Sequence, residues 1–172
     1  MVLYALGDLV PDVHPTAFVH PGATVIGHVA IGAYATIWPS AVLRGDYGRI
    51  SIGDRTSIQD GAVVHATEEH PTVIGADCVV GHIAHLEGCT VEDGCLIGAG
   101  SVVLHRVVVR GGALVGAGAV VSPGTEVPAR AMALGVPAKV RADAVTPGSF
   151  QDAVRRYVAN GKRYSAELRR LD

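Results

Sequence analysis

The sequence predicts an all-β solenoid, a parallel β-helix closed by one C-terminal α-helix, within a single domain of 172 residues. Its main signal is an aliphatic residue recurring near every six positions, most regularly at Ile97, Val103, Val109, Val115, Val121 and Val127. The composition agrees, with 22 glycines and 49% hydrophobic but only 5% aromatic residues. Three short strands joined by tight corners would form one turn of a prism, with the aliphatic residues pointing inward. An α-helix is excluded because a spacing of six forms no stripe on a helix.

Charge and composition also restrict the function. The formal net charge of −2 gives no general attraction for nucleic acid. The sequence has neither a secretory signal pattern nor a run of roughly 20 apolar residues, so we expect a cytoplasmic protein without a membrane segment. Three cysteines, an odd number, favour reduced thiols over a disulfide framework. Cys78 and Cys95 fall at inward positions of the repeat and are expected in the core.

The repeat divides the chain into three segments. The coil is expected over about 11–136, a proline-containing connection over 137–149 and an amphipathic helix, interrupted by Gly161, over 150–172. Within the coil, the interval from Leu43 to Ile52 has three extra residues and the interval from Val64 to Ile74 has four. These residues must leave the coil as loops, which commonly carry functional sites.

Counting three units per turn stacks Leu43, Val64 and Leu86, so the residues that follow them also stack. Those residues are Arg44, His65 and Glu87, which point outward as a polar column. His85 lies on the same side of its strand as Glu87. His82 belongs to a different face or corner of the prism. If three prisms pack about a three-fold axis, His82 of one subunit can face His65 and Glu87 of its neighbour.

The sequence resembles the γ-class carbonic anhydrase-like proteins, a hexapeptide-repeat family of trimers with metal at the subunit interfaces. The resemblance covers about residues 5–172. It rests on Arg44-Gly45-Asp46, Ser57-Ile58-Gln59-Asp60-Gly61, Val64-His65, Gly81-His82, Leu86-Glu87-Gly88-Cys89 and Gly135-Val136-Pro137-Ala138. It implies a left-handed coil, a homotrimer and one divalent ion at each subunit interface, with zinc the favoured ion.

The resemblance also implies roles for individual residues. His65 and His82 match metal-binding histidines, whereas Glu87 stands where the family has a third histidine. Two histidines and a glutamate still form an established zinc set. His85 is an alternative third ligand, with Glu87 then accepting its hydrogen bond. The remaining matched positions are Arg44 and Asp46 at the subunit contact, Gln59 near the bound water, Asp60 as a supporting carboxylate and Tyr164 as a helix tyrosine approaching the site.

The activity implied is the reversible hydration of carbon dioxide to bicarbonate, without a cofactor beyond the ion. A carboxylate ligand offsets one charge of the metal, so Glu87 is expected to weaken that activity. Two other functions stay open: a coenzyme A-dependent acyltransferase and a non-catalytic trimeric binding or assembly module. A metal-free pairing of His65 and His82 with Glu87 across the trimer is also open. Histidines at no ligand position are expected to be exposed polar residues, namely His14, His20, His28, His70 and His105.

Overall fold

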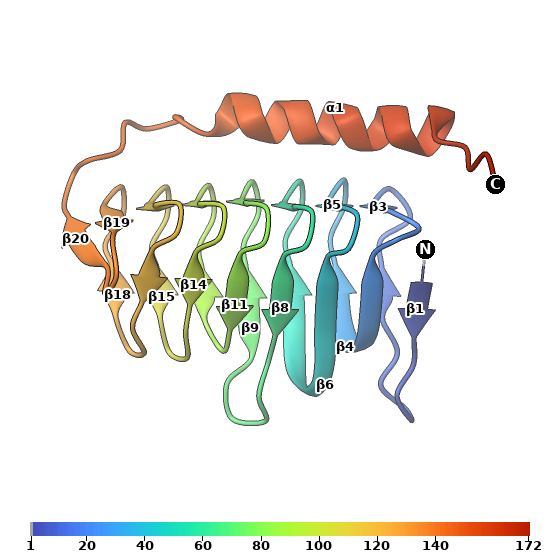
Figure 1. Ribbon diagram of the computed structural model, residues 1–172, viewed down its shortest axis with the longest axis horizontal. Coiled ribbons are helices and arrows are strands. Elements are labelled where there is room, and N and C mark those ends of the chain that lie inside the picture. Colours follow the sequence, from blue (N-terminus) through green and yellow to red (C-terminus); the bar gives the residue numbers. More distant parts are fainter. Residues whose placement is uncertain (1) are drawn as a thin grey trace.

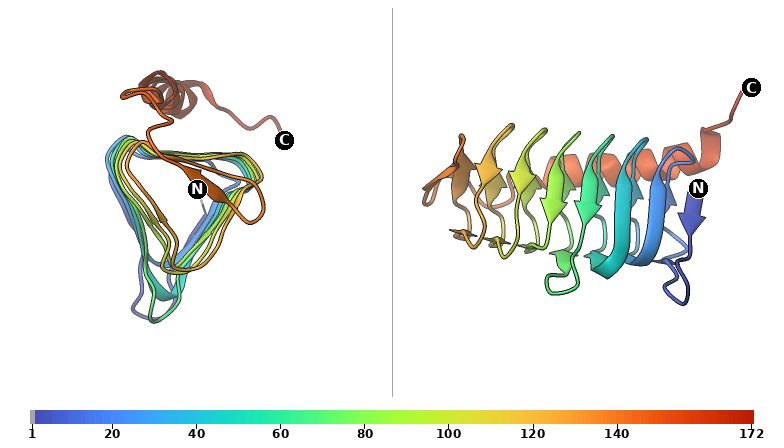
Figure 2. Two further views of the ribbon diagram at one scale, coloured as in Figure 1. Left: turned by 90° about the vertical axis from the view of Figure 1, so that its left-hand side faces the viewer. Right: turned by 60° about the horizontal axis from the view of Figure 1, so that its bottom comes forward.

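The computed structural model describes residues 2–172 and shows a left-handed parallel β-helix with a triangular cross-section, accompanied by one long helix (Figures 1 and 2). Successive strands along the chain visit three walls in turn. The first wall contains β1 (Val2–Tyr4), the first parts of β4 (Thr24–Ile31) and β6 (Val42–Ile52), β8 (Val63–His65), β11 (His85–Glu87), β14 (Val102–Val103) and β17 (Val120–Val121). The second wall contains β2 (Asp12–Val13), the second parts of β4 and β6, β9 (Thr72–Ile74), β12 (Thr90–Val91), β15 (Val108–Val109) and β18 (Glu126–Val127).

The third wall is a separate sheet. It contains β3 (Phe18–Val19), β5 (Thr36–Ile37), β7 (Ser57–Ile58), β10 (Val79–Val80), β13 (Leu96–Ile97), β16 (Leu114–Val115) and β19 (Met132–Leu134). The final strand, β20 (Lys139–Arg141), pairs antiparallel with β19. The expected connection therefore begins with a strand that folds back on the last turn of the coil.

The inward aliphatic residues form the core that the six-residue count predicts. The residues of the first wall stack in register as Leu43, Val64, Leu86, Val103 and Val121, and each has an exposed fraction of 0%. Burial of such side chains stabilises the coil by about 1.5–3 kcal/mol each. The three cysteines are buried as free thiols, which confirms the core placement of Cys78 and Cys95.

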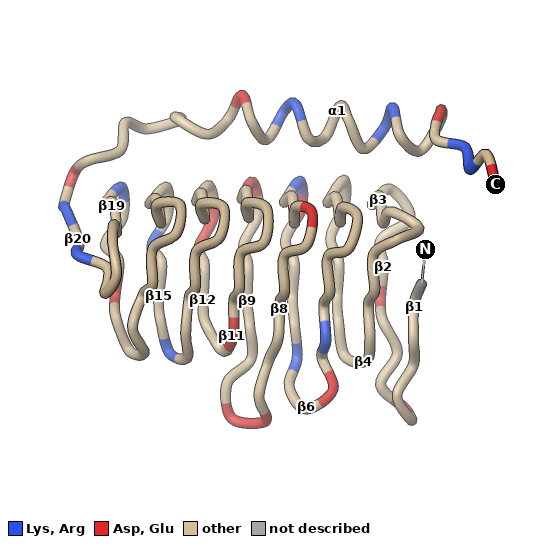
Figure 3. The backbone as a smooth tube through the Cα atoms, viewed as in Figure 1, with Lys and Arg blue, Asp and Glu red and all other residues tan. Residues whose placement is uncertain are grey.

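Both irregular intervals project at the corner between the first and second walls. Residues 66–71 form a loop between β8 and β9, as predicted. The extra residues between Leu43 and Ile52 instead stay within β6, which passes through the corner as one extended strand. Figure 3 shows acidic residues on both projections. They lie beside the ends of the first-wall strands, where the predicted polar column is found.

The helix α1 (Gln151–Glu167) runs back along the coil and contacts the third wall at β3, β5 and β7 (Figure 1). It passes through Gly161 without interruption, contrary to expectation. Gly161 is buried, and a Cβ there would lie 2.6 Å from Thr36 Cγ2, so glycine permits the close approach of α1 to the wall. The helix ends at Glu167, short of the expected end at residue 172, because Leu168 is extended with ψ 122.

Across residues 2–172, the structure has no helix that is both long enough and apolar enough to cross a membrane.

Candidate functional site

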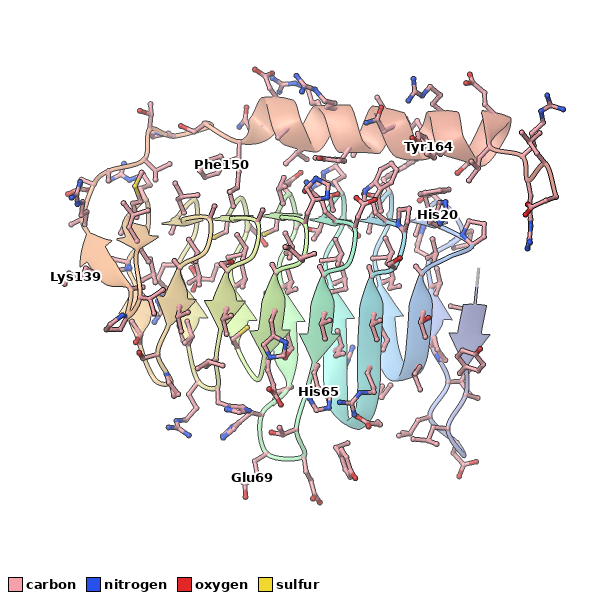
Figure 4. All side chains as sticks on the ribbon, viewed as in Figure 1. His20, His65, Glu69, Lys139, Phe150 and Tyr164 are labelled. Carbon is pink, nitrogen blue, oxygen red and sulfur yellow. The ribbon has the colours of Figure 1, made fainter. Side chains whose placement is uncertain are left out.

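The predicted polar column exists within one subunit. Strand pairing sets Arg44 opposite His65 and His65 opposite Glu87. His65 projects outward from the end of β8 (Figure 4), where its Nδ1 lies 2.9 Å from Glu87 Oε1 and its Nε2 lies 3.1 Å from Asp46 Oδ1. Arg44 donates to the other oxygen of Asp46. We call Arg44, Asp46, His65, His85 and Glu87 the first-wall cluster.

Glu87 is the centre of the first-wall cluster. In addition to His65, it has His85 Nε2 at 3.3 Å from Oε2, so His85 and Glu87 share a face of β11 as predicted. Partial burial acts to raise the pKa of Glu87, but hydrogen bonds with His65 and His85 outweigh it and hold the pKa below its ordinary value. The carboxylate form of Glu87 is therefore the one that the cluster favours.

Two histidines expected to be exposed polar residues lie beside this cluster. His105 Nε2 is 3.5 Å from Glu87 Oε1, and the His70 ring is 5.9 Å from the His105 ring, centroid to centroid. Both pack around Gly88, where a Cβ would lie 2.8 Å from each of them. The strand register pairs Leu86 with Val103, so two residues further along Gly88 comes beside His105, and this register was the signal that could have found His105.

The other predicted residues gather at the corner between the third and first walls. His82 follows β10, and its Nδ1 lies 3.0 Å from Asp60 Oδ2. Gln59, at the end of β7, is buried on the third wall with 5% of its surface exposed. The His82 side chain is 55% exposed. Because Asp60 occupies Nδ1, Nε2 of His82 is the nitrogen left for a partner outside the subunit.

The helix tyrosine beside this corner is Tyr157. Burial and the charge of Asp60 raise its pKa, while a hydrogen bond with the Gln59 side chain acts in the opposite direction. Tyr164, the tyrosine predicted from the sequence, lies near the C-terminal end of α1 (Figure 4). Its ring packs on the rings of Trp38 and Phe18, with centroids 5.0 and 5.9 Å apart. We call Gln59, Asp60, His82 and Tyr157 the corner cluster.

Comparisons with known proteins agree with the repeat and with the family resemblance. The family model described as bacterial transferase hexapeptide (six repeats) matches residues 71–105. The carnitine operon protein CaiE of Escherichia coli is 40% identical over 139 residues, which cover 81% of this chain and 71% of CaiE. Gamma carbonic anhydrase 1, mitochondrial, of Arabidopsis thaliana is 44% identical over 138 residues, covering 77% of this chain and 50% of that protein. The chain belongs to the γ-carbonic anhydrase-like group of hexapeptide-repeat proteins.

Solved structures of other hexapeptide-repeat proteins share the whole architecture of this γ-carbonic anhydrase-like chain. A Bacillus cereus protein, provisionally assigned as an acetyltransferase, superposes with a TM-score of 0.92 at 33% identity, covering 96% of this chain and 97% of the other. A hexapeptide transferase family protein from Anaplasma phagocytophilum gives a TM-score of 0.89 at 35% identity, covering 95% and 98%. The coil and its returning helix are thus a shared scaffold.

The side chains of this γ-carbonic anhydrase-like protein include two imidazoles and a carboxylate of the kinds that bind zinc, but the described residues of one subunit do not bring all three together. Within residues 2–172 of one subunit, no three His, Cys, Asp or Glu side chains are arranged to hold a metal ion. His65 and Glu87 are in contact on the first wall, whereas His82 lies at another corner. Two imidazoles and a carboxylate are an established zinc set. Both nitrogens of His65 already face carboxylates, so binding an ion would replace one of these contacts.

Proposed function

We propose that this protein is a homotrimer that binds one divalent ion, zinc being favoured, at each subunit interface and hydrates carbon dioxide reversibly. The observation that carries the proposal is the division of the donors. His65 and Glu87 stand in register on the first wall, and His82 presents its free Nε2 from a neighbouring corner. A second copy packed against the first wall would complete the set with its own His82.

The two clusters have separate tasks in this proposal. His65 and Glu87 supply two ligands, and His82 of an adjacent copy supplies the third. Asp60 fixes the orientation of His82 through Nδ1, as carboxylates commonly do for metal-binding imidazoles. A zinc ion in such a site supplies the Lewis acidity that makes water a nucleophile at neutral pH. Glu87, held as a carboxylate by its histidines, offsets part of the ion's charge and limits that effect.

Gln59 and Tyr157 are proposed to position the substrate. The Gln59 amide nitrogen has two hydrogens, so it can donate one to an oxygen of bicarbonate and the other to the Tyr157 hydroxyl oxygen. Tyr157, held in place by its ring against Trp38 at 5.9 Å between centroids, fixes the orientation of that amide. We therefore assign the helix tyrosine of the site to Tyr157 rather than Tyr164.

The test combines mass, metal content and turnover. Wild type and the variants His82→Ala, Glu87→His and His14→Ala are purified, loaded with zinc and freed of excess ion. We expect a trimer with about one ion per subunit, a metal affinity at least tenfold lower in His82→Ala, and carbon dioxide hydration at least tenfold faster in Glu87→His. His14, an exposed histidine outside both clusters, is the matched control and should behave as wild type. A trimer that retains no zinc, or a monomer, would overturn the proposal.

An acyltransferase is the second candidate, favoured by the Bacillus cereus protein of the same architecture that is provisionally assigned as an acetyltransferase. It predicts release of coenzyme A from acetyl-coenzyme A in the presence of a suitable acceptor amine or alcohol, independent of added zinc. A trimer that binds zinc but shows neither activity would instead support a binding or assembly module.

A further inference from the structure

A cavity of about 700 Å³ lies between α1 and the corner where the second and third walls meet, away from both clusters. On the coil side it is lined by turns of successive rungs, from Arg55 to Arg130. These turns are linked by backbone hydrogen bonds, such as those from Gly94 N to Ala76 O and from Gly112 N to Asp93 O. Four rung steps at ~4.8 Å make the cavity a groove roughly 19 Å long, parallel to the coil axis. Its volume is within the range of small-molecule sites.

The groove contains an apolar strip between its charged residues. The helix presents Val154 and Val158 to it. Opposite them, Gly94 and Gly112 form the floor with backbone alone, and both have positive φ values of +70 and +68. A Cβ at Gly94 would meet nothing closer than Gly112 N at 4.0 Å, so no neighbouring side chain fills the space above it. The floor therefore has room for a narrow, extended apolar body.

Cationic side chains exceed carboxylates around the groove, although the whole protein has a net charge of −2. Both carboxylates have partners: Asp77 accepts two bonds from Arg55, each 2.7 Å long, and Asp93 Oδ1 accepts one from Ala76 N at 2.7 Å. Lys162 forms no ion pair within residues 2–172, and its Nζ lies 5.1 Å from the centroid of the Tyr34 ring. The end of the groove at Lys162 can therefore accept an anion.

We propose that this groove binds an elongated amphipathic anion, a linear acyl or alkyl chain with a carboxylate or phosphate head. The chain lies between the Gly94–Gly112 floor and the valines of α1, and the head pairs with Lys162. Arg155, also in the lining, is engaged with Asp152 one turn earlier in α1 and contributes less to the head. The groove is separate from the proposed metal site. It lies at the edge of the third wall that meets the second wall, whereas the corner cluster lies at the edge that meets the first wall.

Binding is measured by isothermal titration calorimetry with octanoate, decanoate, dodecanoate, dodecyl phosphate, dodecanol and acetate, with each amphiphile below its micelle concentration. We expect saturable 1:1 binding per subunit of the two anions, with an affinity that rises three- to fourfold per methylene from octanoate to dodecanoate. Dodecanol and acetate, which lack the head and the chain respectively, should bind at least tenfold more weakly. The two anions distinguish a carboxylate preference from a phosphate preference.

Two variants test where in the groove the ligand binds. Lys162→Glu should weaken dodecanoate binding at least tenfold, and Ala159→Trp, which fills the groove from the exposed side of α1, should abolish it. Lys139→Ala is the matched control, because Lys139 is an exposed lysine on β20 outside the groove. Circular dichroism and mass measurements verify that each variant keeps its fold and oligomeric state. No saturable binding by the wild type, or equal affinities in Lys162→Glu and Lys139→Ala, would overturn the proposal.

Discussion

Leu86→Ala should be among the most destabilising single substitutions in this chain. Leu86 is fully buried between Val64 and Val103 of the adjoining rungs. Loss of three carbon groups removes about 2.4 kcal/mol of transfer free energy, at about 0.8 kcal/mol per group. The rungs are held at a fixed spacing by the strand ladder, so the neighbouring walls cannot collapse into the cavity. A cavity contribution brings the expected loss to about 3–4 kcal/mol.

Urea denaturation followed by circular dichroism measures this loss, with wild type and variant at equal subunit concentration because association shifts apparent stability. Leu168→Ala is the matched control: Leu168 is 46% exposed at the end of α1, so its truncation should change the free energy of unfolding by less than about 1 kcal/mol. Hydrogen exchange should show the largest loss of protection in β8, β11 and β14. A loss below about 1 kcal/mol for Leu86→Ala would refute the rigid-wall reasoning.

Three further predictions follow from the electrostatics and the thiols. The pKa of Glu87 in the folded protein lies below its ordinary value. Ionised Glu87 therefore stabilises the fold at a pH above the pKa of the unfolded chain, and this stabilisation is lost as the pH falls through the pKa of the folded protein. In Glu87→Gln, urea midpoints should accordingly depend less on pH between about 5 and 3 than in wild type or in the exposed control Glu69→Gln. Burial raises the pKa of Cys89 to about 12, so iodoacetamide at pH 8 should label it only after denaturation; rapid labelling of native protein would contradict this. The Arg55–Asp77 pair is 44% and 40% exposed, so a double-mutant cycle should give a coupling energy under about 1 kcal/mol.

Counting residues in the sequence was sufficient to predict the coil and the polar column. Every rung needs an inward aliphatic residue, so Leu43, Val64 and Leu86 could be stacked before any coordinates, and their outward neighbours followed. The path of the corner in β6 could not be predicted in this way. The six-residue count shows that extra residues exist, but it does not say whether the backbone loops out or continues as an extended strand through the corner.

The position of α1 was less predictable than the coil. Its amphipathic stripe identifies the face that packs, but the choice between Tyr157 and Tyr164 depends on how far the helix travels back along the third wall. That distance is set by the fold-back at β20 and by the close contact of Gly161 with Thr36. Both are tertiary features without a local sequence signal. Gly161 read locally is a helix breaker, whereas in the structure it fixes the register of the helix on the coil.

The environment of Glu87 accommodates a carboxylate at the position where the family resemblance implies an imidazole. His65, His85 and His105 all lie within 3.5 Å of its oxygens. A histidine at this position would remove the carboxylate that these three imidazoles share as an acceptor. Their remaining partners in the cluster would be Asp46 and the other imidazoles. Glu87→His alone therefore adds the family's third imidazole but also removes the group that orders the others. The double variant Glu87→His, His105→Asn relieves this crowding. If crowding by His105 limits the single variant, the double variant should bind zinc more tightly than Glu87→His, and equal affinities would show that this crowding does not limit zinc binding.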